Sequence, residues 1–215
     1  MSRNFNWFNK SKLISRYFIN AFFKPNEIEK EIKKINIKYK ISSKISYEKK
    51  LLGTAGAVKK LEKQLGDLFF VVYSDNLMNF DLNKMLTYHI KKKSDFTMAL
   101  YSIKKNPYTG IASSSIRLNK YNKIISFSEQ RGSRGSSKHL VNTGVIILNN
   151  KIYKFIKKNK FTDFSNDVFP DIIKNKKLKF YGYQIEKKNA YCLAIDTPDS
   201  YENFIQILKK IDLIN

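Results

Sequence analysis

A short apolar run, residues 68–72, leads almost directly into the carboxylate of Asp75, and this feature most constrains the fold. The run is aromatic and β-branched, which is typical of a buried strand. Residues 81–86 then begin with an acidic cap and place their apolar side chains on one helix face. Because open α/β sheets bind ligands where strands end, Asp75 is placed for metal and phosphate chemistry. An isolated aspartate at such a position would more often be a turn or cap residue.

Strands and helices are expected to alternate along the rest of the chain. The patterns predict strands at 17–23, 41–47, 96–101, 145–148 and 180–185, a glycine-bearing loop at 51–58 that leads into a helix carrying Val58, Leu61 and Leu65, and further helices starting near residues 27, 82, 152, 167 and 199. Residues 111–118 and 123–128 flank a turn-rich tetrapeptide and predict a β-hairpin. The basic segment 130–138 suits either a solvated connector or a phosphate-contacting lid. The sequence therefore predicts an α/β, Rossmann-like fold in which a mostly parallel sheet is flanked by helices, within a single domain spanning 1–215.

The charge of the chain is high, but it does not by itself indicate a partner. The formal net charge is +23 in 215 residues, with 42% apolar residues. The basic residues are spread along the chain and accompany no zinc-finger, helix-turn-helix or RNA-binding signature, so we do not predict nucleic-acid binding. Cys192 is the only cysteine, which excludes an internal disulfide and suits a small buried side chain in a reducing compartment. With no signal-peptide or membrane-span pattern, we expect a soluble cytoplasmic protein.

Seven short motifs occur along the chain in a fixed order. They are Leu52-Gly53-Thr54-Ala55-Gly56-Ala57, Ser74-Asp75-Asn76, Tyr108-Thr109-Gly110-Ile111, Phe127-Ser128-Glu129, Asn142-Thr143-Gly144-Val145, Phe164-Ser165-Asn166-Asp167-Val168-Phe169-Pro170 and Ile195-Asp196-Thr197-Pro198-Asp199-Ser200-Tyr201. The ordered set resembles the sugar-1-phosphate nucleotidylyltransferase family, especially its mannose and heptose 1-phosphate guanylyltransferase branch. The resemblance runs from about Tyr17 to the carboxyl end.

The resemblance implies a reaction between two anions, a nucleoside triphosphate, with GTP expected, and a sugar 1-phosphate. The sugar phosphate oxygen would displace pyrophosphate at the α-phosphorus, with Mg²⁺ neutralising the charge through carboxylates and phosphate oxygens. It assigns catalysis and metal binding to Asp75 and nucleotide binding to Gly53 and Thr54. The positions matching the sugar pocket, beside the predicted hairpin, are Gly110, Glu129, Asn142 and Gly144.

Two departures from the family pattern concern site residues. The family commonly ends Asp-Ile-Gly-Thr-Pro, so strict alignment puts Ala194 at the second metal position, whereas a shifted register gives that role to Asp196. We expect Asp196 to be the metal ligand. The lysine that usually follows the glutamate of Phe127-Ser128-Glu129 is Gln130, and Arg131 or Lys138 could supply the lost positive charge.

A third departure concerns residues 1–16, an atypical segment that lacks the first strand and the glycine-rich, arginine-containing phosphate loop of the family. The absent strand would be central in the sheet and would leave unpaired strand edges. We therefore expect an amino-terminally truncated member of the family with impaired activity. We expect it either to form a homo-oligomer or to associate with a complementing amino-terminal fragment. The alternative is a non-catalytic nucleotide-sugar-binding or regulatory paralogue.

Overall fold

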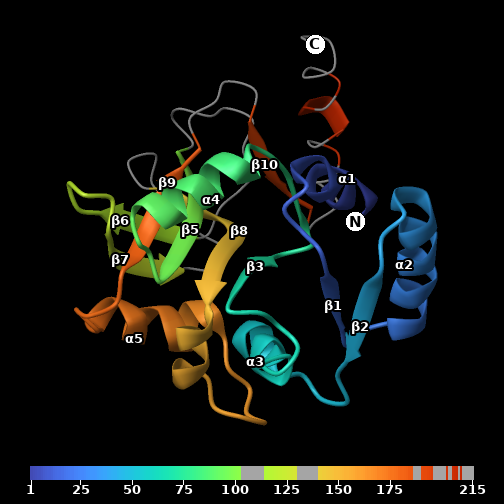
Figure 1. Cartoon of the computed structure of the whole chain (residues 1–215), viewed down its shortest axis with the longest axis horizontal. Coiled ribbons are helices and arrows are strands. Elements are labelled where there is room, and N and C mark those ends of the chain that lie inside the picture. The colour runs from blue at the N-terminus through green and yellow to red at the C-terminus, as the bar shows by residue number, and fades with distance from the viewer. Residues whose placement is uncertain are drawn as a thin grey trace.

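The computed structural model describes residues 1–102, 114–129, 140–185, 190–195, 202, 205–207 and 209 (Figure 1). Its strands are β1 (Tyr17–Ala21), β2 (Ser43–Tyr47), β3 (Leu68–Val72), β4 (Asn76–Asn79), β5 (Phe96–Ser102), β6 (Ser114–Leu118), β7 (Ile124–Glu129), β8 (Leu140–Asn149), β9 (Phe180–Gln184) and β10 (Tyr191–Ala194). Its α-helices are α1 (Ser2–Ser11), α2 (Pro25–Tyr39), α3 (Gly53–Lys60), α4 (Leu82–Lys91) and α5 (Phe169–Lys174). A 3₁₀ segment (Asn150–Phe155) follows β8, and a π-helical turn (Phe164–Val168) precedes α5.

The central sheet is organised around β8. It has six strands in the order β7-β6-β8-β5-β9, and β3 also pairs with β8. β8 runs antiparallel to both β3 and β5, whereas β5 and β9 are parallel. The α/β class with flanking helices is confirmed, and β6 and β7 form the predicted hairpin.

The expected predominance of parallel pairs is wrong for the strands that the structure describes. Only β1–β2 and β5–β9 are parallel. The other pairs are antiparallel: β3–β8, β5–β8, β6–β7, β6–β8 and β4–β10. The physical reason is that β8 is ten residues long and runs against every strand it borders.

Both faces of the sheet are covered, as the alternation of side chains along β8 shows. Ile146 and Leu148 belong to the cluster that packs against α3 and α5, whereas Val145 and Ile147 belong to the cluster beneath α4. A strand buried on both faces reads as a continuous apolar run, which is why β8 could be predicted from the sequence. The helix α4 begins where Asp81 accepts a hydrogen bond from the backbone N–H of Lys84, at 3.1 Å, as its expected acidic cap requires.

The strands β1 and β2 form a separate two-stranded parallel sheet, backed by α2 (Figure 1). Its apolar cluster contains Ile32 and Ile35 of α2 and also Phe5 of α1. Two residues further along α1, Trp7 belongs to the cluster beneath α4. The helix α1 therefore bridges the small sheet and the main one, although residues 1–16 gave no prediction of a helix.

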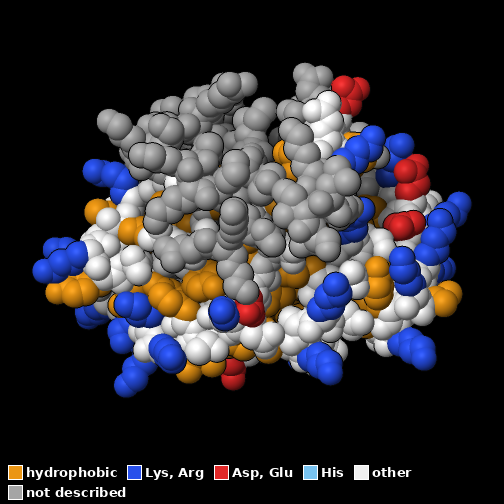
Figure 2. All heavy atoms as spheres, turned by 90° about the horizontal axis from the view of Figure 1, so that it is seen from above, with side chains coloured by type: hydrophobic (Ala, Val, Ile, Leu, Met, Phe, Trp, Pro, Cys, Tyr) orange, Lys and Arg blue, Asp and Glu red, His pale blue; other side chains and the backbone are white. Residues whose placement is uncertain are grey.

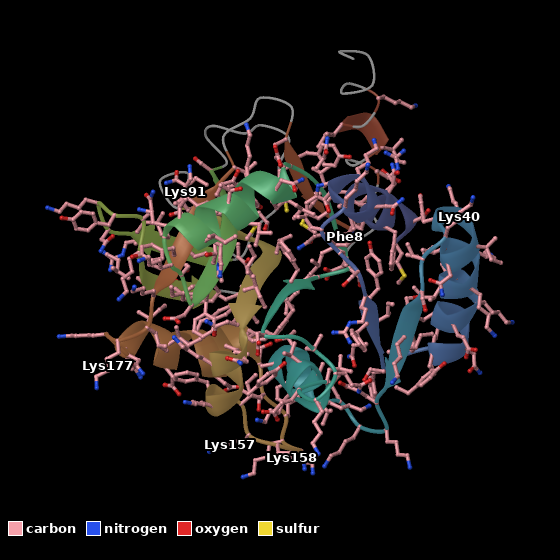
Figure 3. The ribbon with its side chains drawn as sticks, in the orientation of Figure 1. Phe8, Lys40, Lys91, Lys157, Lys158 and Lys177 are labelled. Carbon is pink, nitrogen blue, oxygen red and sulfur yellow. The ribbon has the colours of Figure 1, made fainter. Side chains whose placement is uncertain are left out.

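The basic side chains are distributed widely over the surface. Figure 2 shows Lys and Arg around the edge of the visible face rather than in one patch. In Figure 3 the labelled lysines lie at the periphery, whereas Phe8 lies inside, between α1 and β1. Among the described residues, no helix is long and apolar enough to span a membrane.

A buried histidine predicts how stability depends on pH. His89 is 5% exposed, and its Nδ1 lies 2.9 Å from the Thr97 hydroxyl. Burial lowers the pKa of His89 from 6.5, and the charge of Asp95 only partly opposes this. Around and below pH 6.5 the folded chain thus binds fewer protons than the unfolded chain. The contribution of His89 to stability is therefore fully present above that pH, and it is lost as the pH falls toward the folded pKa.

We expect the melting temperature of the wild type to fall between pH 7.5 and 5.5, and that of His89→Gln to fall less. Glutamine keeps a partner for Thr97 but does not titrate. Asp95 does not contribute to the pH dependence in this window, because its pKa lies below 3.8. Burial raises the pKa of Asp95, but the hydrogen bonds from Lys151, Lys179 and Asn149 lower it by more. Melting curves of both proteins across the window test this, and equal slopes would contradict it.

Candidate functional site

Asp75 lies in the turn between β3 and β4, beside the end of β10. Its backbone carbonyl accepts a hydrogen bond from the N–H of Ile195, at 2.9 Å, and the backbone of Ala194 pairs with that of Asn76. The last motif therefore approaches the strand end that carries Asp75. Asp196, the expected second metal ligand, and Gly110, a predicted sugar-pocket residue, lie outside the described residues, as do the basic segment 130–138 and most of the predicted last helix.

A cavity of about 1220 Å³ adjoins Asp75 and extends between β1 and β3. One end of it is polar and is lined by Thr54, Tyr73, Asp75, Glu129 and Asp163. Burial raises the pKa of the Tyr73 phenol, and the negative charges of Asp163, Glu129 and Asp75 raise it further. Three carboxylates thus line the same cavity as this phenol, in a protein whose formal net charge is +23.

The loop that carries Gly53 and Thr54 is held by the segment before α5. The Thr54 hydroxyl donates to Oδ2 of Asp163, at 2.7 Å, and accepts from the backbone N–H of Phe164, at 2.9 Å. Two further backbone bonds, from the N–H groups of Ala55 and Gly56 to Thr162 O, fix the start of α3. These contacts join residues more than a hundred positions apart, so Thr54 has a fixed position at the polar end of the cavity.

Gly53 is required by this arrangement. Its φ is +77°, a conformation that favours glycine, and a Cβ there would lie 2.5 Å from the carbonyl oxygen of Thr162. We expect Gly53→Ala to destabilise the fold by about 2–4 kcal/mol, from the left-handed backbone and the overpacking together. Urea unfolding measures this. Gly66→Ala is the matched control, because its Cβ would meet one atom at 4.0 Å; equal losses for the two variants would contradict the prediction.

Asn142 and Gly144, two of the residues assigned to sugar binding, lie on β8 and are not among the residues that line the cavity. The N–H of Gly144 donates to Oδ1 of Asn142, at 2.9 Å. Gly144 has φ +78°, and a Cβ there would lie 2.8 Å from Nδ2 of Asn76 and 2.9 Å from Cβ of Tyr73. Gly144 therefore allows the turn that carries Asp75 to pack closely on β8.

Two residues of the polar end were missed from the sequence, Tyr73 and Asp163. Tyr73 continues the apolar run of β3 and reads as one more core residue. Asp163 precedes the motif Phe164-Ser165-Asn166-Asp167 and accepts hydrogen bonds from the backbone N–H groups of Ser165 and Asn166, so it reads as a capping residue. The only sequence signal for Asp163 is its place next to a motif of the resemblance.

The donors at the polar end suit a hard divalent cation that is shared with a phosphate. No cluster of three or more histidine, cysteine, aspartate or glutamate side chains able to hold a metal occurs among the described residues. Mg²⁺ does not need one, because it commonly takes one or two carboxylates and completes its shell with substrate phosphate oxygens and water. Asp75 and its neighbours supply oxygen ligands of the right kind.

Comparison with known proteins identifies relatives along nearly the whole chain. A family model described as nucleotidyl transferase matches residues 7–206. The D-glycero-alpha-D-manno-heptose 1-phosphate guanylyltransferase of Aneurinibacillus thermoaerophilus is 29% identical over 91% of this chain and 79% of its own. The probable glucose-1-phosphate cytidylyltransferase of Bacillus subtilis is 26% identical over 73% of this chain and 54% of its own.

Solved structures share the fold. HddC from Yersinia pseudotuberculosis superposes with a TM-score of 0.73 at 20% identity, covering 94% of this chain and 84% of that one. The same protein complexed with GMP-PN superposes with a TM-score of 0.75 at 20% identity, over 95% and 83% of the two chains. The α/β architecture of the chain is therefore the architecture of these proteins.

Proposed function

The chain belongs to the nucleotidyl transferase family, and we propose that it transfers a nucleoside monophosphate from a nucleoside triphosphate to a sugar 1-phosphate, releasing pyrophosphate. GTP is the first choice of nucleotide, because a relative that covers most of the chain is a guanylyltransferase. The observation that carries the proposal is that Thr54, Asp75 and Glu129 line one cavity, although the resemblance assigned them separately to nucleotide, metal and sugar.

In this proposal each residue at the polar end has a distinct task. Asp75 holds Mg²⁺, which when bound would neutralise the charge of the two phosphorylated substrates. The loop of Gly53 and Thr54 lies against the nucleoside, and the fixed position of Thr54 orients it. The Glu129 carboxylate accepts hydrogen bonds from sugar hydroxyls. The bond formed joins a sugar phosphate oxygen to the α-phosphorus, and the bond broken releases pyrophosphate with its electron pair.

The remaining assignments are part of the same proposal. Asp196 would be a second metal ligand, beside the backbone bond of Ile195 to Asp75. Gly110, Asn142 and Gly144 would complete the sugar pocket, the last two from β8. We propose the cytoplasm as the compartment, since the buried, unpaired thiol of Cys192 suits a reducing environment.

The test is pyrophosphate release from the purified chain. GTP, CTP, UTP and ATP are each paired with heptose, mannose and glucose 1-phosphates, with and without Mg²⁺. We expect Mg²⁺-dependent release with at least one pair, and GTP to be preferred. Nucleotide-sugar binding by calorimetry without any release would refute catalysis and support the non-catalytic alternative; no binding and no release would refute the proposal altogether.

A further inference from the structure

Two strand edges face the same cavity without a strand between them. Within the described ranges β1 pairs only with β2, and β3 pairs only with β8, so each has one open edge. The cavity is lined along its length by all of β3 and by most of β1, and Figure 1 shows no ribbon between them. Open edges of this kind are templates for pairing with another strand.

The hydrogen-bonding groups at these edges can be identified from the bonds on the other side. The N–H of Tyr73 donates to Gly144 O on β8, so along β3 the residues of opposite alternation, Phe70 and Val72, turn their N–H and C=O groups toward the cavity. Ala21 O accepts from Glu48 N beyond β2, so on β1 the same argument selects Phe18 and Asn20. All four residues line the cavity.

The cavity has room for a strand and for substrates. With strands spaced about 4.8 Å apart, a rise of about 3.3 Å per residue and a layer about 10 Å thick, a five-residue strand occupies about 800 Å³. Both β1 and β3 are five residues long. Of the 1220 Å³, about 400 Å³ would remain at the polar end, which is within the range of small-molecule pockets.

The surroundings also specify the side chains of the occupant. Phe69 and Val71 pack on one core cluster and Phe70 and Val72 on the other, so a neighbouring strand would be buried on both faces and should be a continuous apolar run. Among the described residues, the charged side chains that line the cavity are three carboxylates at the polar end and one arginine, Arg16. A basic residue next to the apolar run would therefore be favoured by charge complementarity.

A buried polar atom points to the same ligand. Asn4 of α1 is 4% exposed and lines the cavity, and its Nδ2 donates to Asn76 O, at 2.7 Å. Its Oδ1 has no hydrogen-bond partner among the described residues. A buried acceptor without a donor is costly, and an inserted peptide could supply one.

We propose that the slot between β1 and β3 binds an extended, apolar segment of a separate polypeptide, about five residues long and flanked by a basic residue. The segment pairs with Phe18 and Asn20 on one side and with Phe70 and Val72 on the other, and it joins the two sheets into one. This binding does not depend on the proposed reaction. It is β-augmentation, in which backbone bonds give affinity and side-chain pockets give specificity.

The probe is a synthetic peptide of five alternating valine and isoleucine residues followed by two glycines and an arginine, with a polar tag for solubility. At a hundredfold excess over its Kd it should raise the melting temperature by about 5–10 °C. It should also protect the amides of Phe18, Asn20, Phe70 and Val72 from hydrogen exchange. The control peptide has the same sequence with N-methyl groups at the second and fourth strand residues, which removes two donors.

A pair of variants locates the binding edge. Val72→Pro removes an N–H that faces the cavity, whereas Ile45→Pro removes one on the outer edge of β2, and both side chains are partly buried apolar residues. We expect Val72→Pro to weaken peptide binding about tenfold or more and Ile45→Pro to leave it unchanged. Absence of binding, or equal binding of the N-methylated peptide to the wild type, would overturn the proposal. Protection of the same amides by dimerisation without peptide would overturn it too, by assigning the slot to a second copy.

Discussion

Replacing Asp75 with asparagine is expected to lower the rate of pyrophosphate release by about two to three orders of magnitude, the usual cost of removing one preorganised electrostatic contact to a phosphoryl transition state. Asparagine keeps the size of the side chain but not its charge. The backbone carbonyl of residue 75, which accepts the hydrogen bond from Ile195, is unaffected, so the fold should be preserved. Initial rates at a series of Mg²⁺ concentrations, with circular dichroism of both proteins, measure this.

The matched control for this prediction is Asp67→Asn. Asp67 is exposed, immediately precedes β3, and accepts a hydrogen bond from Nδ2 of Asn150, at 2.7 Å, whereas Asp75 follows the other end of the same strand. We expect Asp67→Asn to keep activity within about twofold, since surface substitutions away from a site change little. Turnover by Asp75→Asn equal to that of the wild type would remove Asp75 from the reaction. An equal loss in both variants would indicate a general effect of charge.

The sequence predicted the elements whose signal is local. The runs that became β3, β5 and β8 are apolar because these strands are buried, and Asp81 caps α4 because its side chain lies before the first helical turn. Strand direction could not be predicted in the same way, because side-chain alternation is identical in a strand and in its reverse. For this reason the sheet was expected to be mostly parallel. β8 was expected to be shorter because only residues 145–148 form its continuous apolar run.

The candidate site was predictable only in part. The position of Asp75 after a strand follows from the pattern of residues, but its approach to Glu129 and Thr54 depends on contacts between distant parts of the chain. The bond between Thr54 and Asp163 spans 109 positions, and no local signal indicates it. The resemblance supplied Thr54 and Glu129, and it could not supply Tyr73 or Asp163, which none of its motifs contains.

The segment 1–16 shows most clearly where the sequence was insufficient. It contains a helix, α1, of ten residues, which buries apolar side chains against two different parts of the fold. Phe5 packs with β1 and α2, and Trp7 packs with Phe80 and α4, so two faces of one short helix are buried against different clusters. Its burial is visible only once both partners are in place.

Trp7→Ala is therefore expected to destabilise the chain by about 3–5 kcal/mol, the usual range for removing a buried aromatic side chain. Trp7 is 8% exposed, its ring centroid lies 4.9 Å from that of Phe80, and its Nε1 donates to Phe80 O, at 2.6 Å. The truncation leaves a cavity and an unpaired carbonyl. Lys12 and Arg16 lie in the segment that connects α1 to β1. Because loss of Trp7 should loosen α1, trypsin should cut the variant faster than the wild type at these two residues.

Two further variants separate the contributions to this loss. Trp7→Phe keeps an aromatic ring and loses the indole donor, so it should cost about 1–3 kcal/mol, the penalty for one unsatisfied buried group. Phe23→Ala removes a ring that is 72% exposed and should change stability by less than about 0.5 kcal/mol. Urea unfolding of the three variants gives the comparison. A loss below about 1 kcal/mol for Trp7→Ala, by the scale of ordinary surface substitutions, would mean that α1 does not anchor the small sheet to the main one.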